Sequence, residues 1–459
     1  MEKPPMDQDP VYALARHVTR ATLADIPASA RESANTFILD TVGVGISGRN
    51  GPMAAQLAEA VTAMGDGQQA RVWGSGRALP AAQAALCNAY QAHCQEYDCV
   101  HEAAVAHVLT IVLPAALATA ERSGKVTGAT ILEAVILGVD VAASLGVAAT
   151  SGLRFFRPGT AGAFGGAAAA GKVLGLNENQ MVEAFSLVYG QLGGTMQAHT
   201  EGSGLLALQM GFNARNAVFA ADLAAAGFTG PHNILFGDFG YFRLIEDGGD
   251  PKALTEGLGN VWRITEVAHK PYPSGRATHG ILDGCLALQR EHGFEAHGVA
   301  QIKLRVPPLI EHLVGRPAKT EMAINYARLC ARYVLACALH GRGVALNDFT
   351  PKAYRREGHQ ALAAKVEMIV DSDQDPNALT PIRIEIRLNS GEVLERMVTH
   401  VYGSPENPMT HAAHLDKFRA NCALGERPLP TAQIEELIRL VASLEEVEDV
   451  TALVDATIA

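Results

Sequence analysis

The stretch "TAGAFGGAAAAGKVLGL", residues 160–176, decides the fold class, because its Ala and Gly residues recur at helical spacing. Small side chains let helices approach closely, so the stretch predicts the packing face of a buried helix. A phosphate-binding loop is the alternative, but no strand precedes the stretch and no GK[ST] sequence ends it. An anionic group at the N-terminus of this helix stays open, since backbone N–H groups and the helix dipole converge there.

Helical periodicity extends over most of the first 265 residues. It predicts Ala-rich helices at 81–96, 127–145, 161–174, 178–192 and 213–226. Asn177 is placed to cap one of these helices, and Gly227 to end another. Alanine-rich faces of this kind are typical of a large all-helical domain.

The pattern changes after residue 269. The stretch "AQIKLRVPP" (300–308) alternates like a strand, and "TPIRIEIRLNSGEVLERMVTHV" (380–401) predicts a hairpin turning at Asn389-Ser390-Gly391. Residues 319–339 predict a helix, and 351–366 one or two more. We therefore expect a mainly α protein with a large all-helical domain (1–267), a smaller α+β domain (268–404) and a C-terminal segment (405–459). If that segment packs back on the helical domain, that domain is discontinuous.

Composition narrows the class of protein. The chain has 459 residues, a formal net charge of −11 and 48% hydrophobic residues, which predicts a globular protein that does not bind nucleic acid. Residues 131–149 come closest to a membrane span, but Glu133 and Asp140 interrupt them, so we expect a buried helix and no membrane association. Seven cysteines without a CxxC pair, and no apolar signal in residues 1–10, favour a cytoplasmic protein with reduced thiols.

A second stretch, "CNAYQAHCQEYDCVHEAAVAHVL" (87–109), concentrates groups that transfer protons. Asp98, His101, Glu102 and His107 fall where a helix gives way to irregular structure, and a carboxylate beside imidazoles can move protons at neutral pH. A solvated helix end is the simpler alternative. The nearby cysteines and histidines lack the close pairs of zinc motifs, so no metal site is predicted. His199, beside Glu201, is a weaker candidate.

A basic loop, "AHKPYPSGRATHG" (268–280), follows at the join of the two predicted domains. Lys270, Arg276 and His279 sit on a frame stiffened by two prolines, and such side chains hold carboxylates or phosphates through charge-assisted hydrogen bonds. A linker with surface charge is the alternative. The neighbouring aromatic and apolar residues favour a packed loop, at the kind of join where ligand clefts form.

Several motifs, in this order, resemble the MmgE/PrpD family of 2-methylcitrate dehydratases, cis-aconitate decarboxylases and an iminodisuccinate epimerase. They are "LDTVGVGISG", "NAYQAHCQEYD", "HVLTIVLPAALATAERSGKVTGATILEAVILGVDV", "GTAGAFGGAAAAGKVLGLNENQ", "AADLAAAGFTGP" and "KPYPSGRATHGILDG". The resemblance covers about residues 10–350. It implies a helical domain with a smaller α+β lid, a cleft between them, a homodimer, and chemistry without metal or organic cofactor.

Position by position, the resemblance implies that Asp98, His107 and Lys270 are catalytic. Thr278 and His279 match the pair that follows the family's lysine loop.

The chain also departs from the family pattern at polar positions. The family's histidine falls on Phe156 or Arg157, its lysine near Leu206, and its cysteine or histidine on Gly275. The departures predict a substrate with fewer carboxylates, or one gripped partly by Arg157 and His199.

The leading hypothesis is a cofactor-independent lyase that removes a proton next to a carboxylate of a small di- or tricarboxylic acid. His107 would be the base, oriented by Asp98, while Lys270 and Arg276 stabilise the developing charge. An isomerase with a second base, His101 or His199, is the alternative within enzymes. A non-catalytic carboxylate-binding homologue is the alternative outside them.

Overall fold

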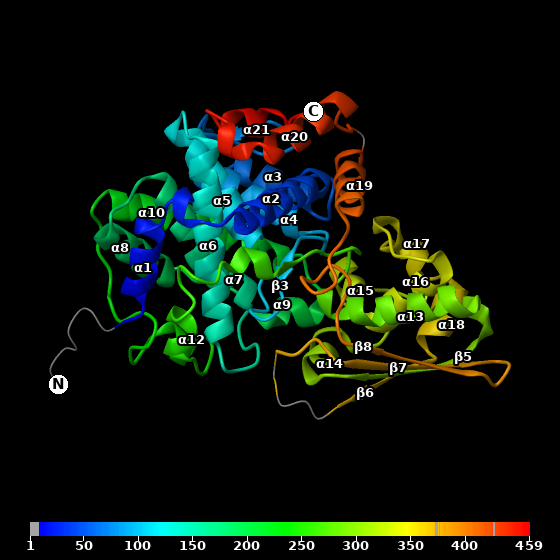
Figure 1. Cartoon of the computed structure of the whole chain (residues 1–459). Coiled ribbons are helices and arrows are strands. Elements are labelled where there is room, and N and C mark those ends of the chain that lie inside the picture. Colours follow the sequence, from blue (N-terminus) through cyan, green and yellow to red (C-terminus); the bar gives the residue numbers. More distant parts are fainter. Residues whose placement is uncertain (1–8, 372–374, 376, 426) are drawn as a thin grey trace.

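The computed structural model describes residues 9–371, 375, 377–425 and 427–459 and confirms the mainly α fold (Figure 1). Its central helices pack against one another: α4 (Ala81–His93), α5 (Leu109–Ser123), α6 (Gly128–Ala148), α7 (Arg157–Val173) and α10 (Leu205–Ala225). Around them lie α1 (Val11–Arg20), α2 (Ala28–Gly48), α3 (Ala54–Thr62), α8 (Glu178–Tyr189), α9 (Met196–Glu201), α11 (Tyr241–Leu244) and α12 (Pro251–Thr255). A two-stranded ribbon, β1 (Ala70–Arg71) with β2 (Ala78–Leu79), connects α3 to α4.

Helices α6 and α7 cross where a glycine of one faces a glycine of the other. A Cβ added to Gly165 would lie 2.4 Å from the Gly138 carbonyl oxygen, and one added to Gly138 would lie 2.7 Å from the Gly165 oxygen. The backbones are therefore in direct contact, which a larger residue would prevent. The stretch 160–176 is the packing face that its composition predicts.

Helix α6 is the predicted buried helix. By length and composition alone it is long and apolar enough to cross a membrane, but 89% of its most apolar window is buried inside the protein. Thr127 caps it by accepting a hydrogen bond from the Thr130 N–H. Asn177 caps α8 in a capping box with Gln180, as its position predicts. Gly227, two residues after α10, has the positive φ of 87° expected at a helix end.

The α+β part contains a four-stranded sheet in the order β6-β5-β7-β8. The strands are β5 (Val299–Val306), β6 (Val366–Val370), β7 (Ile382–Leu388) and β8 (Val393–Val398). Strands β7 and β8 form the predicted hairpin, with Gly391 at a φ of 92°. Helix α13 (His279–His292) packs on this hairpin, where Gly280 and Gly284 face Ile382 and Ile384.

Two details differ from the sequence prediction. The helix predicted over 319–339 is broken into α15 (Ile324–Arg328) and α16 (Ala331–Gly341), because the Gly275 N–H binds the Arg328 carbonyl and Cys330 is extended. The region predicted as helix up to residue 366 contains α17 (Pro351–Tyr354) and α18 (Glu357–Ala363) and ends at β6, which pairs in parallel with β5.

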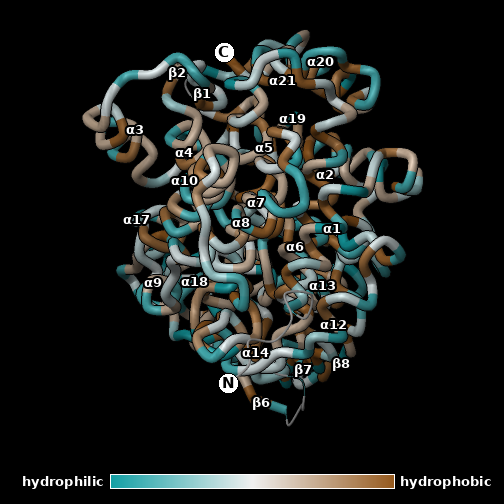
Figure 2. Tube along the Cα trace, turned by 90° about the vertical axis from the view of Figure 1, so that its left-hand side faces the viewer, coloured by the Kyte–Doolittle hydropathy of each residue, from teal (hydrophilic) through white to brown (hydrophobic). Residues whose placement is uncertain are grey.

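The C-terminal helices lie against the first helices of the chain. Helices α19 (His411–Cys422) and α20 (Thr431–Ala442) contact α2, and α21 (Thr451–Asp455) contacts α5 (Figure 1). Helix α20 is amphipathic and contains both hydrophobic and hydrophilic residues (Figure 2). Its buried side chains are Ile434, Leu437, Leu440 and Val441. The domain boundaries and the discontinuous organisation stay predictions.

Candidate active site

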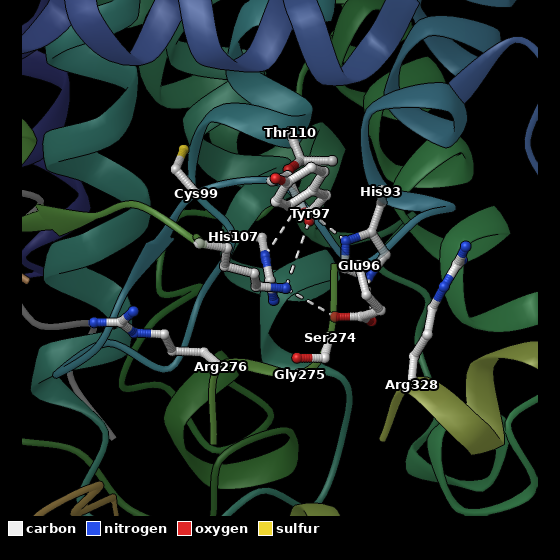
Figure 3. Close-up of polar contacts among 12 residues, drawn as sticks. His93, Glu96, Tyr97, Cys99, His107, Thr110, Ser274, Gly275, Arg276 and Arg328 are labelled. Carbon is white, nitrogen blue, oxygen red and sulfur yellow. Dashed lines mark hydrogen bonds and ion pairs between the residues drawn. The ribbon is translucent and has the colours of Figure 1, made fainter. Parts of the chain in front are cut away.

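Two short strands bring distant parts of the chain together. β3 (Val100–His101) and β4 (Val267–Ala268) pair antiparallel, with Val100 opposite Ala268. This pairing lays the stretch after α4 beside the basic loop 268–280. The polar side chains of both stretches gather at this junction (Figure 3).

Asp98 is the centre of the group. Its buried Oδ2 lies 2.9 Å from His93 Nδ1 and 3.0 Å from His107 Nδ1, and it accepts a hydrogen bond of 2.5 Å from Thr110 Oγ1. The two imidazole rings meet edge to face, with centroids 4.7 Å apart. Because both rings turn Nδ1 toward the same carboxylate, Nε2 is the nitrogen left for chemistry in His107, while Nε2 of His93 lies 3.4 Å from Glu96 Oε1.

Lys270 neutralises a second carboxylate beside this one. Its Nζ donates a hydrogen bond of 2.8 Å to Glu96 Oε2 and lies 3.8 Å from Asp98 Oδ1. The Lys270 side chain is completely buried. Its ammonium therefore balances two buried carboxylates, which would be costly to hold without a cation.

The two histidines have opposite pKa shifts. Burial lowers the pKa of His93, but the Asp98 and Glu96 carboxylates together raise it, and the net shift is upward. Burial also lowers the pKa of His107, and here the attraction of Asp98 is not enough to offset it, so the net shift is downward. Neighbouring imidazoles with opposite shifts are suited to act as a proton donor and a proton acceptor.

Both carboxylates are held ionised. Burial raises the pKa of Asp98, but His107, His93 and Lys270 together hold it well below its usual value. Burial likewise raises the pKa of Glu96, and Lys270 above all lowers it to about 2. Near neutral pH the group thus contains two negative charges beside one ammonium.

A pocket of about 620 Å³, including its open mouth, adjoins this group. His93, Glu96 and His107 line it, as do Glu102, His199 and Arg276. Lys270 and Asp98 are not among the lining residues, so they act on the pocket through Glu96 and the two histidines. The expectation that Lys270 grips substrate thus meets a difficulty, since its ammonium is already engaged by Glu96.

The remaining basic-loop residues hold the loop in place. Arg276 lines the pocket, and its Nε donates to Glu102 Oε1 at 2.6 Å. His279 is buried, with Nδ1 3.3 Å from an Arg276 nitrogen and Nε2 3.3 Å from the Ser274 carbonyl oxygen. Thr278 Oγ1 donates to the Gly275 carbonyl. Thr278 and His279 therefore orient Arg276 and the turn rather than line the pocket.

The other predicted binding residues have different surroundings. His199 lines the pocket, and burial first and Arg316 second lower its pKa to about 3. His101 is buried, with Nε2 2.9 Å from Glu266, outside the pocket lining. Arg157 is also outside the lining and is fully buried.

The Arg157 guanidinium is already occupied. Its Nε and Nη2 contact the Glu246 carboxylate at 2.8–3.0 Å, and Nη2 also donates to the Ser151 carbonyl. To bind substrate, Arg157 would have to leave the buried Glu246 charge unpaired. We therefore leave Arg157 and His101 out of the proposed site.

Comparison with known proteins identifies the family. Sequence models of the MmgE/PrpD N-terminal and C-terminal domains match residues 12–254 and 272–446. The chain belongs to the MmgE/PrpD family.

Curated relatives extend over nearly the whole chain. A cis-aconitate decarboxylase-like protein of Aspergillus oryzae is 27% identical, over 96% of this chain and 95% of its own. The cis-aconitate decarboxylase of Aspergillus terreus is 26% identical (94% and 92%), and that of Homo sapiens 27% (91% and 88%). These relatives and the family support an enzyme of the lyase type.

The structure shows where the positions lie at which this chain departs from the MmgE/PrpD sequence pattern. Phe156 lines the pocket, and its ring centroid lies 6.0 Å from that of His93. A Cβ on Gly275 would lie only 2.7 Å from Leu329, so hydrocarbon fills the space in front of this position. Leu206 is buried in the hydrophobic core and does not line the pocket.

His93 and Glu96, which line the pocket, were not singled out from the sequence. His93 is the last residue of α4 and Glu96 follows three positions later, so the end of one helix turns both toward the pocket. The signal was the dense run His93, Glu96 and Asp98, of which only the last was chosen. Three ionisable residues within six positions at a helix end indicate a cluster of side chains as clearly as Asp98 and His107 do.

Two groups in the described part of the chain have spacings that a metal ion can use: Asp40, His269 and His414, and His93, Glu96 and His107. In the first, Lys417 Nζ lies 2.7 Å from Asp40 Oδ1, and in the second, Lys270 binds Glu96. A buried ammonium already neutralises each carboxylate, which disfavours a second cation there. The proposals below therefore use no metal.

Proposed function

We propose that this chain is a cofactor-independent lyase that acts on a small carboxylic acid by removing the proton next to a carboxylate. The observation that carries the proposal is the pair His93 and His107, which share Asp98, line one pocket and have opposite pKa shifts. One imidazole is thereby poised to take a proton and the other to give one.

The proposed reaction uses these residues in order. His107 Nε2 takes the proton, and the C–H electron pair moves into the adjacent carboxylate as an enediolate. In a dehydration, the C–O bond at the neighbouring carbon breaks while His93 gives its proton to the departing oxygen, which leaves as water. A decarboxylation would need no initial proton removal: the C–C bond to a carboxylate breaks, CO₂ leaves, and the electron pair left on the carbon takes the His93 proton.

Arg276 is the proposed contact for a substrate carboxylate. It lines the pocket, and its Nη2 makes one long contact, 3.4 Å to the Val401 carbonyl, so an N–H of this nitrogen remains to bind substrate. Lys270 keeps Glu96 and Asp98 ionised and so sets the charge around both histidines. Arg276 is proposed to stabilise the enediolate as it forms.

An isomerase is the second candidate, because His199 is another neutral imidazole that lines the same pocket. It would serve as a second base, on the opposite face of the carbon from His107. The stereochemistry of deuterium incorporation from D₂O separates the two. Incorporation with inversion supports the isomerase, and formation of an unsaturated or decarboxylated product supports the lyase.

A panel of mono-, di- and tricarboxylic acids tests the proposed function. Thermal shift identifies the acids that bind, and NMR of the reaction mixture identifies products, with and without prior treatment with EDTA. We expect turnover of at least one acid, with loss of water or CO₂, at the same rate after EDTA. Binding without any product would instead support a non-catalytic homologue, and activity restored only by one divalent ion would contradict the metal-free proposal.

The homodimer implied by the family resemblance is also a proposal, together with a cytoplasmic location. Light scattering of the purified protein at micromolar concentration measures the mass directly. We expect twice the 48.4 kDa of the chain. A monomeric mass across that concentration range would contradict it.

A further inference from the structure

The pocket has a polar wall and a larger apolar wall. The polar wall is formed by His93, Glu96, Glu102, His107, His199 and Arg276. Most of the other lining residues carry hydrocarbon side chains from several separate segments, of which the largest belong to Leu153, Phe156, Met196, Leu313, Leu329 and Leu379. Binding a hydrocarbon group against apolar walls of this extent is favourable. Binding a charged group against them costs free energy, because the charge loses its water.

The apolar wall reaches the reacting groups. The Phe156 ring lies beside His93, and Leu329 with Val314 fills the space in front of Gly275, where a Cβ would lie 2.7 and 3.5 Å from them. Phe156 is 5% exposed and Leu329 3%, so both are held firmly by their surroundings. A substrate atom bonded to the reacting carbon on this side therefore meets hydrocarbon.

The pocket offers little positive charge to bind substrate carboxylates. Arg276 is the one permanently charged cation among the described residues that line the pocket, and Glu102 already pairs with it. Its Nη1 is used by the carbonyl oxygens of His269 and Tyr402, at 3.0 and 2.8 Å. One edge of Arg276 can meet one substrate carboxylate, and a second carboxylate can accept hydrogen bonds from the histidines of the polar wall.

The guanidinium of Arg316, which contacts the pocket residue His199, is also engaged. Arg316 donates to the His199 carbonyl at 2.9 Å and to the Leu313 carbonyl at 3.1 Å, and its Nη2 lies 3.2 Å from His199 Nδ1. These contacts hold Arg316 against the His199 ring. A third substrate carboxylate would consequently be placed against the apolar wall without a cation.

We propose that the substrate of this pocket is an acid with at most two carboxylates that carries an alkyl group on the reacting side, packed against Phe156, Leu313 and Leu329. The proposal rests on the proposed function for the reaction, but not for the selection between acids. Phe156 is the specificity-determining residue, because it is the apolar side chain beside His93.

A matched pair of acids tests the selection. Ethylmaleate differs from cis-aconitate in one group: CH₃ replaces the third carboxylate. Isothermal titration calorimetry should give a dissociation constant at least about tenfold lower for ethylmaleate, the size of discrimination that an apolar pocket achieves for small groups. Equal or tighter binding of cis-aconitate would overturn the proposal.

A variant with a matched control tests whether Phe156 causes the preference for ethylmaleate. Phe156→Gln should reduce or reverse the preference for ethylmaleate, because an amide replaces the ring beside His93. Phe155→Gln is the control, since Phe155 is 38% exposed and outside the pocket lining, and it should leave the preference unchanged. Should Phe156→Gln fail to fold, Leu313→Gln, at a half-buried lining position, replaces it. An unchanged preference in the folded variant would refute the assignment.

Product analysis of both acids separates the two proposals. If ethylmaleate binds more tightly but neither acid reacts under any condition, the substrate class stands and the proposed reaction fails. If cis-aconitate binds as tightly and is converted, the reaction stands and the substrate class fails. Conversion of ethylmaleate in preference to cis-aconitate supports both.

Discussion

Replacing His107 with alanine is expected to lower turnover by about 10²–10⁴-fold, the contribution that a positioned general base typically makes. The KM should change much less, because a base acts mainly in the transition state. Steady-state kinetics on the acid found in the panel measures both. His292→Ala is the control, since His292 is exposed on α13, and it should behave as the parent enzyme.

The pH profile checks the same assignment. The base must be neutral to accept a proton, and burial holds the pKa of His107 below its usual 6.5. Activity governed by His107 should therefore persist at pH 6.5 and fall only as the pH drops further. Turnover retained in His107→Ala, or an acid limb centred above pH 6.5, would show that another group is the base.

Replacing Lys270 with methionine is expected to lower the free energy of unfolding by about 3–5 kcal/mol, because the change removes one partner of a buried charge group. The ammonium is completely buried between Glu96 and Asp98, which would be left as two adjacent carboxylates. Chemical denaturation, monitored by circular dichroism, measures the loss.

A surface lysine supplies the control for this variant. Lys303 is paired with Glu385 across strands β5 and β7, with about a third of each side chain exposed. Lys303→Met should cost no more than about 1 kcal/mol, as is usual for exposed pairs. If Lys270→Met costs as little as Lys303→Met, the group around Asp98 is not an ionised buried network.

The fold followed from local patterns wherever those patterns are periodic. The spacing of Ala and Gly in 160–176 predicted a buried packing face, and the glycine contact between α6 and α7 explains why. The alternation in 380–401 likewise predicted the β7–β8 hairpin. Strand β6 was missed because "VEMIV" follows a helix directly, and only its pairing with β5 makes it a strand.

The site was predictable only in part, because it depends on long-range contacts. Asp98 and His107 lie in one dense stretch and were found, but the two-residue strands β3 and β4 that bring Lys270 beside them have no sequence signal. Arg157 was predicted to grip substrate because the histidine of the family pattern falls on Phe156 or Arg157. Its partner Glu246 lies 89 residues away, and nothing local reveals that the charge is already paired.

The central claim is that His107 removes a proton from the carbon next to a carboxylate, and hydrogen exchange in D₂O tests it most directly. The acid found in the panel is incubated with the parent enzyme and with His107→Ala, and NMR follows deuterium at that carbon in substrate and product. The account predicts enzyme-dependent incorporation that the variant loses by about 10²-fold or more. Incorporation at the parent rate in His107→Ala would contradict it.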